Sequence, residues 1–300
     1  MSIDQDLVNG CYVKYLGRPA EQGGLKYYAQ FESIVDVEHE IAASQEFLSR
    51  ERVLRYPCSF HSWKTCVLEE AKIVFVPIAK CAHTAVVSAL YDFKNIDWRT
   101  LNVSDAEVLE SGTDDEFLHY VLGSNKTGLL LKDHSPEFAD RILRDTEWLR
   151  VAVLRDPVAR FLSAFNHFFI QWRTHPLGLR HTKVILDALG EDFDANSSTG
   201  MIKVMKYIMT QRGCDLDAHF APQYEYVGGI RMDRLIPMAR LDLLEKLVSE
   251  RSGRTFRIER KNVRRDTVKD GEGAPEDVRE LVEEYFWLDR LLYEKALCAC

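Results

Sequence analysis

The sequence predicts an α/β fold, in which a parallel sheet is flanked by helices and preceded by a small all-helical unit. The first observation is a short β-branched run, 72–76, followed by a loop and by helical spacing over 84–90. The second is a similar run, 149–154, followed by Asp156 and Pro157, which suit the N-cap and the first turn of a helix. Strands that alternate with helices are typical of a parallel sheet covered on both faces.

The beginning of the chain has helical spacing only. Apolar residues recur at helical intervals over 6–16, 25–31 and 38–47, and we expect a small helical domain over residues 1–52. This domain resembles the helical domain related to phycobilisome linkers that is common in bacterial surface-polysaccharide proteins. The matching segments are 15–19 (YLGRP), 24–28 (GLKYY) and 44–47 (SQEF).

Composition excludes several classes of function. The 39 basic and 47 acidic residues give a formal net charge of -8, which argues against nucleic acid or an anionic membrane as partner of the whole chain. No apolar run reaches the roughly 18 residues of a membrane span. The N-terminus lacks a signal-peptide pattern, so a cytoplasmic location is expected. The seven cysteines form no CxxC pair, which predicts reduced thiols with no metal site.

The loop after the first strand has the chemistry of a phosphate-binding site. It runs over 77–84 and carries Lys80 and Thr84, with a helix start that offers backbone N–H groups to an anion. In open α/β sheets, ligands bind at the carboxyl ends of the strands. The GxxxxGK[ST] pattern is absent, so the site is P-loop-like and not a Walker A loop. The alternative is a solvated lysine in a surface loop.

A second anion signal follows the second strand. Arg155 ends this strand, and its guanidinium suits a bidentate grip on a phosphate. Ser163 lies eight residues further along, and helical spacing places it with Arg160 and His167 on the polar side of the helix. The alternative is a surface salt bridge from Arg155 to Asp156 or a nearby acid.

Together these two motifs resemble the cofactor motifs of the carbohydrate sulfotransferase superfamily, which includes the chondroitin, HNK-1 and uronyl 2-O enzymes. The resemblance extends over about residues 60–297, so we expect a sulfotransferase domain over 60–300. It implies 3′-phosphoadenosine 5′-phosphosulfate (PAPS) as co-substrate. Arg155 and Ser163 would bind the 3′-phosphate. The 5′-phosphosulfate would be bound by the loop residues Lys80, Cys81, Ala82, His83 and Thr84. One departure is Ala79, where the family often has Pro.

Three further segments extend the resemblance. The first is 132–135, and the second is 217–223, which resembles a His-x-x-Pro-Gln segment of the family. The third consists of a closing helix over 275–297 and the basic stretch 251–265 before it. The alternative interpretation of this basic stretch is a loop that is exposed to solvent and has no function. In the family such a loop covers the cofactor, which here implies Lys261, Asn262, Arg264 and Arg265.

Sulfuryl transfer needs a base for the acceptor hydroxyl, and a histidine suits this task. His134 is our first candidate, because it follows the expected strand 128–131 and lies 21 residues before Arg155, a spacing that resembles the uronyl 2-O enzymes. His219 is the second candidate, and a third alternative is that a different residue is the base. Lys80 would stabilise the leaving oxygen, and no metal is required.

The acceptor is expected to be a hydroxyl compound, and the resemblance favours a glycan. Its pocket would be formed by the insertions 95–125 and 171–200, with Trp98, Trp172, Arg173, His175, Arg180 and His181. Two other functions are alternatives to sulfuryl transfer. A nucleotide-dependent kinase is disfavoured by the missing Walker A glycines. A non-catalytic carbohydrate-binding or assembly protein that keeps the fold is the main alternative.

Overall fold

The computed structural model describes most of the chain. The described residues are 3–16, 18–31, 33–44, 46, 64–101, 118, 125–190, 192–211, 213, 216–228, 230–259 and 273–299.

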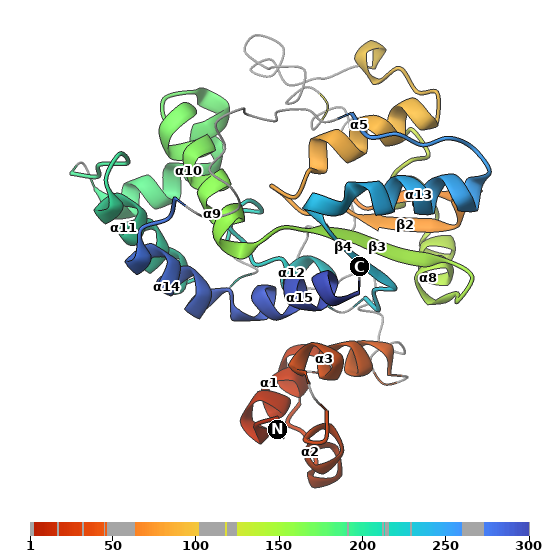
Figure 1. Ribbon diagram of the computed structural model, residues 1–300, viewed down its shortest axis with the longest axis horizontal. Coiled ribbons are helices and arrows are strands. Elements are labelled where there is room, and N and C mark those ends of the chain that lie inside the picture. Colours follow the sequence, from red (N-terminus) through yellow and green to blue (C-terminus); the bar gives the residue numbers. More distant parts are fainter. Residues whose placement is uncertain are drawn as a thin grey trace.

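A four-stranded sheet lies at the centre of a mixed α/β fold (Figure 1). Its order is β1 (Cys66–Leu68), β2 (Ile73–Val76), β3 (Leu149–Leu154) and β4 (Arg234–Pro237). The strands expected over 72–76 and 149–154 are confirmed, as β2 and β3. β2, β3 and β4 are parallel, whereas β1 pairs antiparallel with β2, so the expectation of a wholly parallel sheet is wrong at this edge. β1 and β4 have three and four residues, too few for a periodic pattern to reveal them.

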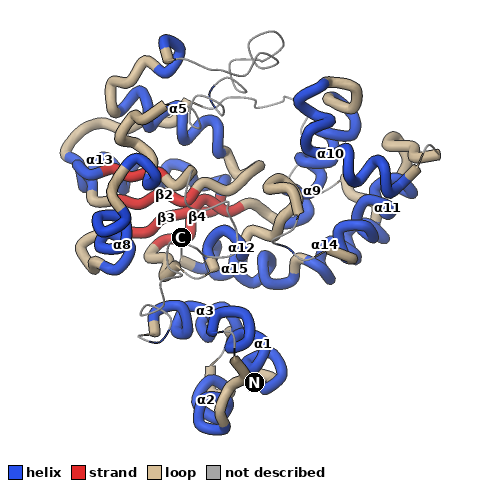
Figure 2. The backbone as a smooth tube through the Cα atoms, turned by 180° about the vertical axis from the view of Figure 1, so that it is seen from behind, coloured by secondary structure: helices blue, strands red, loops and turns tan. Residues whose placement is uncertain are grey.

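Helices cover both faces of the sheet (Figures 1 and 2). Both views place α5 (His83–Phe93) on one side, and α12 (Tyr224–Val227) and α15 (Trp287–Cys298) on the other. α13 (Leu241–Ser252) contacts β4. β2 is wholly buried, as expected for a strand covered on both faces. Four 3-10 turns, Glu69–Ala71, Trp98–Thr100, Leu131–Asp133 and Met238–Arg240, connect these elements.

A group of helices lies beyond the carboxyl end of β3. Asp156 caps α9 (Pro157–Phe165) by accepting the Ala159 N–H at 2.9 Å, as the sequence predicts. A π-helical turn, Asn166–Gln171, continues this helix and leads to α10 (Pro176–Leu189) and α11 (Ser198–Met209). The insertion 171–200 is therefore mainly helical. π-helical turns occur frequently at functional sites.

The single closing helix expected over 275–297 is two helices. α14 (Glu276–Tyr285) and α15 meet at Phe286, whose φ and ψ of −96° and 31° are not helical. The two halves face different neighbours, because α14 packs on α9 and α11 whereas α15 packs on β4. Phe286 is itself buried at this junction.

Three helices form the N-terminal part: α1 (Gln5–Leu16), α2 (Gln22–Tyr28) and α3 (Ile34–Ala43). α2 and α3 begin three and four residues earlier than expected, and α2 includes the Gly23–Gly24 pair. α3 contacts α15, and Asp36 pairs with Lys295. The boundary between two domains stays a prediction, since 47–63 lie outside the described residues.

α8 (Pro136–Arg144) completes the helices. Within the described residues, no helix combines the length and the apolar character needed to cross a membrane.

Candidate functional site

The loop between β2 and α5 carries Lys80 on an unusual backbone. Lys80 and Ala82 have positive φ values of 67° and 56°. This left-handed conformation costs a non-glycine residue about 1–2 kcal/mol, and such strain gathers at functional sites. Ala82 is the N-cap of α5, provides no side-chain cap, and is followed by a first turn without an acidic residue. A left-handed turn joined to a helix start is well suited to an anion.

The loops after β2 and β3 are held together by the side chain of Gln223. Its Oε1 accepts the Arg155 N–H at 2.9 Å and the Cys81 thiol at 3.2 Å, and its Nε2 donates to the Arg155 carbonyl at 2.8 Å. The Arg155 guanidinium also donates to the Lys80 carbonyl at 3.3 Å. The structure therefore brings Lys80 and Arg155 together at one rim of the sheet, as the two motifs predict.

The remaining cofactor candidates of these motifs have different exposure. Thr84 and Ser163 are partly exposed, whereas Cys81 and His83 are buried. Burial raises the pKa of the Cys81 thiol to about 11, so this thiol stays protonated near neutral pH. Burial also holds the pKa of His83 well below its usual value. Only the backbone of these two residues is suitably placed to meet an anion.

Asp156 does not form the surface salt bridge with Arg155 that was the alternative. It pairs with Arg290 of α15 at 2.6 Å. This ion pair joins the start of α9 to the closing helix.

Arg160 is not on the polar side of α9, contrary to the sequence prediction. Its side chain is 3% exposed. Nε donates to the Ala79 carbonyl at 3.0 Å and Nη2 to the Ala218 carbonyl at 3.3 Å. Buried carbonyls compensate the desolvation of the guanidinium, which helical spacing alone does not reveal. Arg160 therefore anchors the loop after β2 at Ala79, where the sulfotransferases that this loop resembles often have Pro.

A buried carboxylate supports the other side of Gln223. Asp289 of α15 accepts the backbone N–H of Gln223 at 2.7 Å and that of Tyr224 at 2.9 Å. Burial raises the pKa of Asp289 to about 6, although the nearby Arg160 and the two N–H donors act against this rise.

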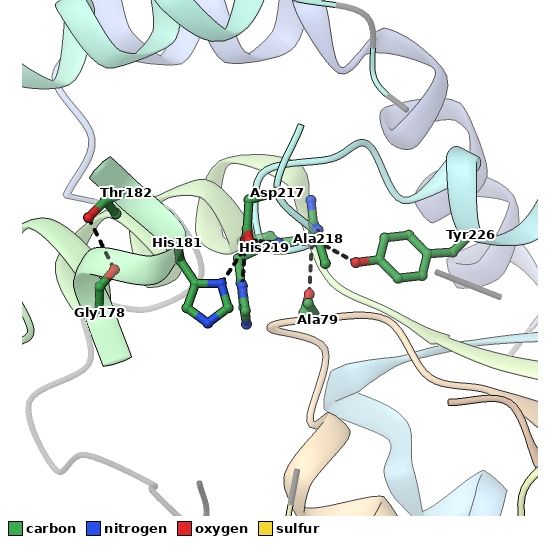
Figure 3. A network of polar contacts seen from close by, with 9 residues as sticks. Ala79, Gly178, His181, Thr182, Asp217, Ala218, His219 and Tyr226 are labelled. Carbon is green, nitrogen blue, oxygen red and sulfur yellow. Dashed lines mark hydrogen bonds and ion pairs between the residues drawn. The ribbon is translucent and has the colours of Figure 1, made fainter. Parts of the chain in front are cut away.

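Two histidines share the carboxylate of Asp217 (Figure 3). His219 Nδ1 lies 2.7 Å from Oδ1, and His181 Nδ1 lies 2.7 Å from Oδ2. The His219 N–H also donates to Oδ1 at 2.9 Å. His181 comes from α10, whereas the other two residues lie in the turn after α11, so the carboxylate joins two distant segments.

Burial and the neighbouring charges determine the protonation states of Asp217 and His219. Burial raises the pKa of Asp217, but the two imidazoles outweigh burial and hold this pKa well below its usual range, so the carboxylate is ionised. Burial lowers the pKa of His219 to about 4, with Asp217 acting against this shift and with His181 and Lys80 adding to it. An ionised carboxylate only accepts hydrogen bonds, so both Nδ1 atoms carry hydrogen, and the neutral ring of His219 keeps a lone pair on Nε2.

Phe168 connects this trio to Lys80 in the loop after β2. It belongs to the π-helical turn after α9. Its ring centroid lies 4.6 Å from that of His219, 5.2 Å from that of His181 and 5.9 Å from the Lys80 ammonium nitrogen. The lysine and both imidazoles therefore surround one aromatic ring.

His134 lies elsewhere, and the expectation that it shares the rim of Lys80 is wrong. The segment 128–131 is not a regular strand, because only Leu130 forms a bridge, with Cys66. The chain then turns back, since the Asp133 carboxylate accepts the N–H of Leu130 and of the two residues Thr127 and Gly128.

The side chain of His134 follows this turn away from the site. Its Nε2 lies 3.1 Å from the Gly128 carbonyl oxygen, and its ring stacks on Phe138 at 4.8 Å. Phe138 in turn contacts Trp148, the residue before β3. Arg155 follows the other end of this six-residue strand, which spans about 20 Å. His134 is therefore a packed structural residue near the amino end of β3.

The described half of the basic stretch has structural contacts. Arg251 donates to the carbonyls of Ala71 and Glu147, at 2.6 and 2.7 Å. Arg254 donates to the Phe93 carbonyl at 2.8 Å. The residues implied as a cofactor cover, Lys261, Asn262, Arg264 and Arg265, lie outside the described residues, so their role stays a prediction.

With this geometry in place, the comparison with known families is decisive. Residues 63–296 match the model of the sulfotransferase family. The chain belongs to the sulfotransferase family. It is thus a transferase that moves a sulfuryl group, and its acceptor carries a hydroxyl. Neither curated proteins nor solved structures give a significant match.

In this sulfotransferase, sequence reasoning missed the roles of Asp217 and Phe168. The spacing of Asp217 and His219 shows that both lie in one turn, but not that a histidine 36 residues away joins them. His181, Asp217 and His219 are also the one group with metal-ligand side chains close together in the described part of the chain. The Nδ1 atoms of the two histidines already lie at hydrogen-bond distance from the oxygens of Asp217.

Proposed function

We propose that this sulfotransferase transfers the sulfuryl group of PAPS to a hydroxyl of a carbohydrate acceptor, with His219 as general base. The observation that carries this proposal is the common position of the Lys80 ammonium and the His219 imidazole around Phe168. A transfer between two oxygens needs a positive group on the leaving side and a base on the attacking side. These two residues provide both.

The donor fits the rim formed by the loops after β2 and β3. Lys80 and the start of α5 favour the 5′-phosphosulfate, because an ammonium and helix N–H groups both attract anions. Arg155, from the neighbouring loop, suits the 3′-phosphate, and Ser163 and Thr84 offer hydroxyl donors. The bound donor supplies an activated sulfuryl group, whose bond to the phosphate oxygen breaks as the acceptor oxygen bonds to sulfur.

His219 takes the proton of the acceptor hydroxyl on Nε2. Asp217 holds the opposite nitrogen, Nδ1, and so fixes both the tautomer and the orientation of the ring, as an acid partner does in other histidine bases. Lys80 stabilises the negative charge that develops on the leaving oxygen.

The pKa of His219 is consistent with this role. At about 4 it leaves the ring unprotonated at neutral pH. Lys80 is one cause of this low value, and an anionic donor beside Lys80 would offset its charge. This would raise the pKa of His219 in the donor complex and make the ring a stronger base.

The test is incubation with a PAPS donor labelled in its sulfuryl group and a panel of glycan, lipid and small phenolic acceptors. We expect labelled glycan from the wild type and no turnover from folded Lys80→Ala. Lys132→Ala, at an exposed position away from the site, is the matched control. Near-normal transfer by folded Lys80→Ala would contradict the assignment. Binding of 3′-phosphoadenosine 5′-phosphate (PAP) without any transfer would instead favour a non-catalytic carbohydrate-binding protein.

The donor arrangement has its own test. Arg155→Ala and Ser163→Ala should each weaken binding of PAP by about 1–3 kcal/mol, the usual size for hydrogen bonds to charged groups. They should hardly change binding of adenosine 5′-phosphosulfate, which lacks the 3′-phosphate. Equal losses for both nucleotides in calorimetry would contradict these roles.

A further inference from the structure

His181 has a second nitrogen that the proposed reaction does not use. Within the described part of the chain, the polar contacts of His181 and His219 are made through Nδ1, on the Asp217 carboxylate. Both Nε2 atoms therefore lie on the far side of their rings from Asp217, as Figure 3 shows. Each is a hydrogen-bond acceptor in the neutral ring.

The two acceptor atoms belong to one site. The ring centroids of His181 and His219 are 4.8 Å apart, with the ring planes at 79°. The side chains are 29% and 24% exposed, so a solute can reach them. Both rings contact Phe168, whose ring also lies beneath Lys80. A molecule that meets Nε2 of His219 thus also lies next to the ring of His181.

One hydroxyl cannot satisfy both atoms, because it has a single hydrogen to donate. If one O–H donates to His219, the second Nε2 needs another donor within about 2.8 Å. A hydroxyl on the adjacent carbon of the acceptor meets this need. If the bound compound covers the second Nε2 atom without donating a hydrogen bond to it, the loss of water from that atom carries a free-energy cost. A compound with only one hydroxyl is therefore disfavoured.

We propose that His181 is an acceptor-positioning residue that binds the hydroxyl next to the one that receives the sulfuryl group. The site therefore selects acceptors with two neighbouring hydroxyls, as in a sugar ring, over acceptors with one. The inference rests on the proposed function and adds the feature of the substrate that the site recognises, which is a pair of neighbouring hydroxyls. His219 alone takes the proton, whereas the part of His181 is to accept a hydrogen bond.

Two substitutions distinguish the roles of the two ring nitrogens of His181, because each keeps the hydrogen bond of only one of them. In His181→Asn, the amide can still donate to Asp217 near the position of Nδ1, but the outer acceptor is gone. In His181→Gln, the longer amide places an oxygen near the position of Nε2 and gives up the Asp217 contact. Lys183→Ala, an exposed neighbour on α10, is the control.

The test uses methyl glycopyranosides and their monodeoxy counterparts, which lack the neighbouring hydroxyl, with PAPS as donor. The wild type should prefer the complete sugar in kcat/KM by about tenfold or more. His181→Asn should remove this preference mainly by raising KM for the complete sugar, and the acid limb of the pH profile should persist, because the base His219 is retained. His181→Gln should retain part of the preference.

The opposite result has a clear meaning. If His181→Gln loses kcat on both acceptors while His181→Asn behaves as wild type, His181 acts through Asp217 and the proposal is overturned. Equal transfer by the wild type to complete and deoxy sugars also overturns it, but leaves the proposed function intact. PAP binding with no transfer to any sugar removes the proposed function, and this inference with it.

Discussion

Replacing Gln223 with Met tests whether one buried amide holds together the loops after β2 and β3, which we propose to bind the donor. Gln223 is fully buried. Met has a similar length but cannot replace the hydrogen bonds that the amide makes with the N–H and carbonyl of Arg155 and with the Cys81 thiol. The substitution therefore removes polar partners while it nearly preserves volume.

The expected cost follows from the groups left behind. The N–H and the carbonyl of Arg155 both lose their partner, and each unsatisfied buried group costs about 1–3 kcal/mol. The thiol of Cys81 is a weak donor and adds little. We expect Gln223→Met to lower the free energy of unfolding by about 2–6 kcal/mol in total.

Urea unfolding at neutral pH measures this change. Gln30→Met is the control, because Gln30 is exposed and makes a hydrogen bond with the Lys26 carbonyl only locally. Its effect should stay within about 0.5 kcal/mol. In calorimetry, Gln223→Met should weaken binding of PAP more than that of adenosine 5′-phosphosulfate. Equal unfolding free energies of the two variants would refute the reasoning.

Three further predictions concern other parts of the site. Gly178→Ala should lower kcat by about 10–100-fold with donor affinity unchanged, because its Cβ would lie 2.3 Å from the Trp172 carbonyl oxygen and α10 must shift, as steady-state kinetics can show. For the free enzyme, kcat/KM should rise as pH increases through about 4, the pKa of His219. Asp217→Asn should move this limb to lower pH, since the carboxylate raises that pKa, and should reduce the plateau by about 10²–10⁴-fold. Because the folded-state pKa of Asp289 is raised to about 6, its contribution to stability is complete below about pH 4 and is lost as pH rises through about 6. Asp289→Asn should remove that part of the pH dependence, and unchanged curves of unfolding free energy against pH would contradict it.

The elements around the donor site could be predicted because their signals are local. The strand over 149–154 is bounded as expected, and Asp156 caps the following helix. A β-branched run and a capping residue act through neighbours in the chain, so the sequence shows them directly. β4 was missed because four residues give too little alternation to detect.

The side chains that complete the site depend on contacts between distant segments. Helical spacing assigned Arg160 to the polar face of α9, but the Ala79 and Ala218 carbonyls make a buried position favourable. His134 and His219 were equally acceptable as bases by residue type. The turn at Asp133 removes the first, and the carboxylate of Asp217 orients the second. No pattern within one segment contains either contact.

The buried guanidinium of Arg160 divides the site into a fixed part and an exchangeable part. Because it binds both Ala79 and Ala218, the spacing between the Lys80 loop and the His219 turn is set inside the protein core. His181 stands outside this link, on α10. On the proposed role of His181, grafting a different helix over 176–189 would redirect which compound is modified while Lys80 and His219 keep their separation. This arrangement offers protein engineers one segment in which to change acceptor preference without rebuilding the catalytic machinery.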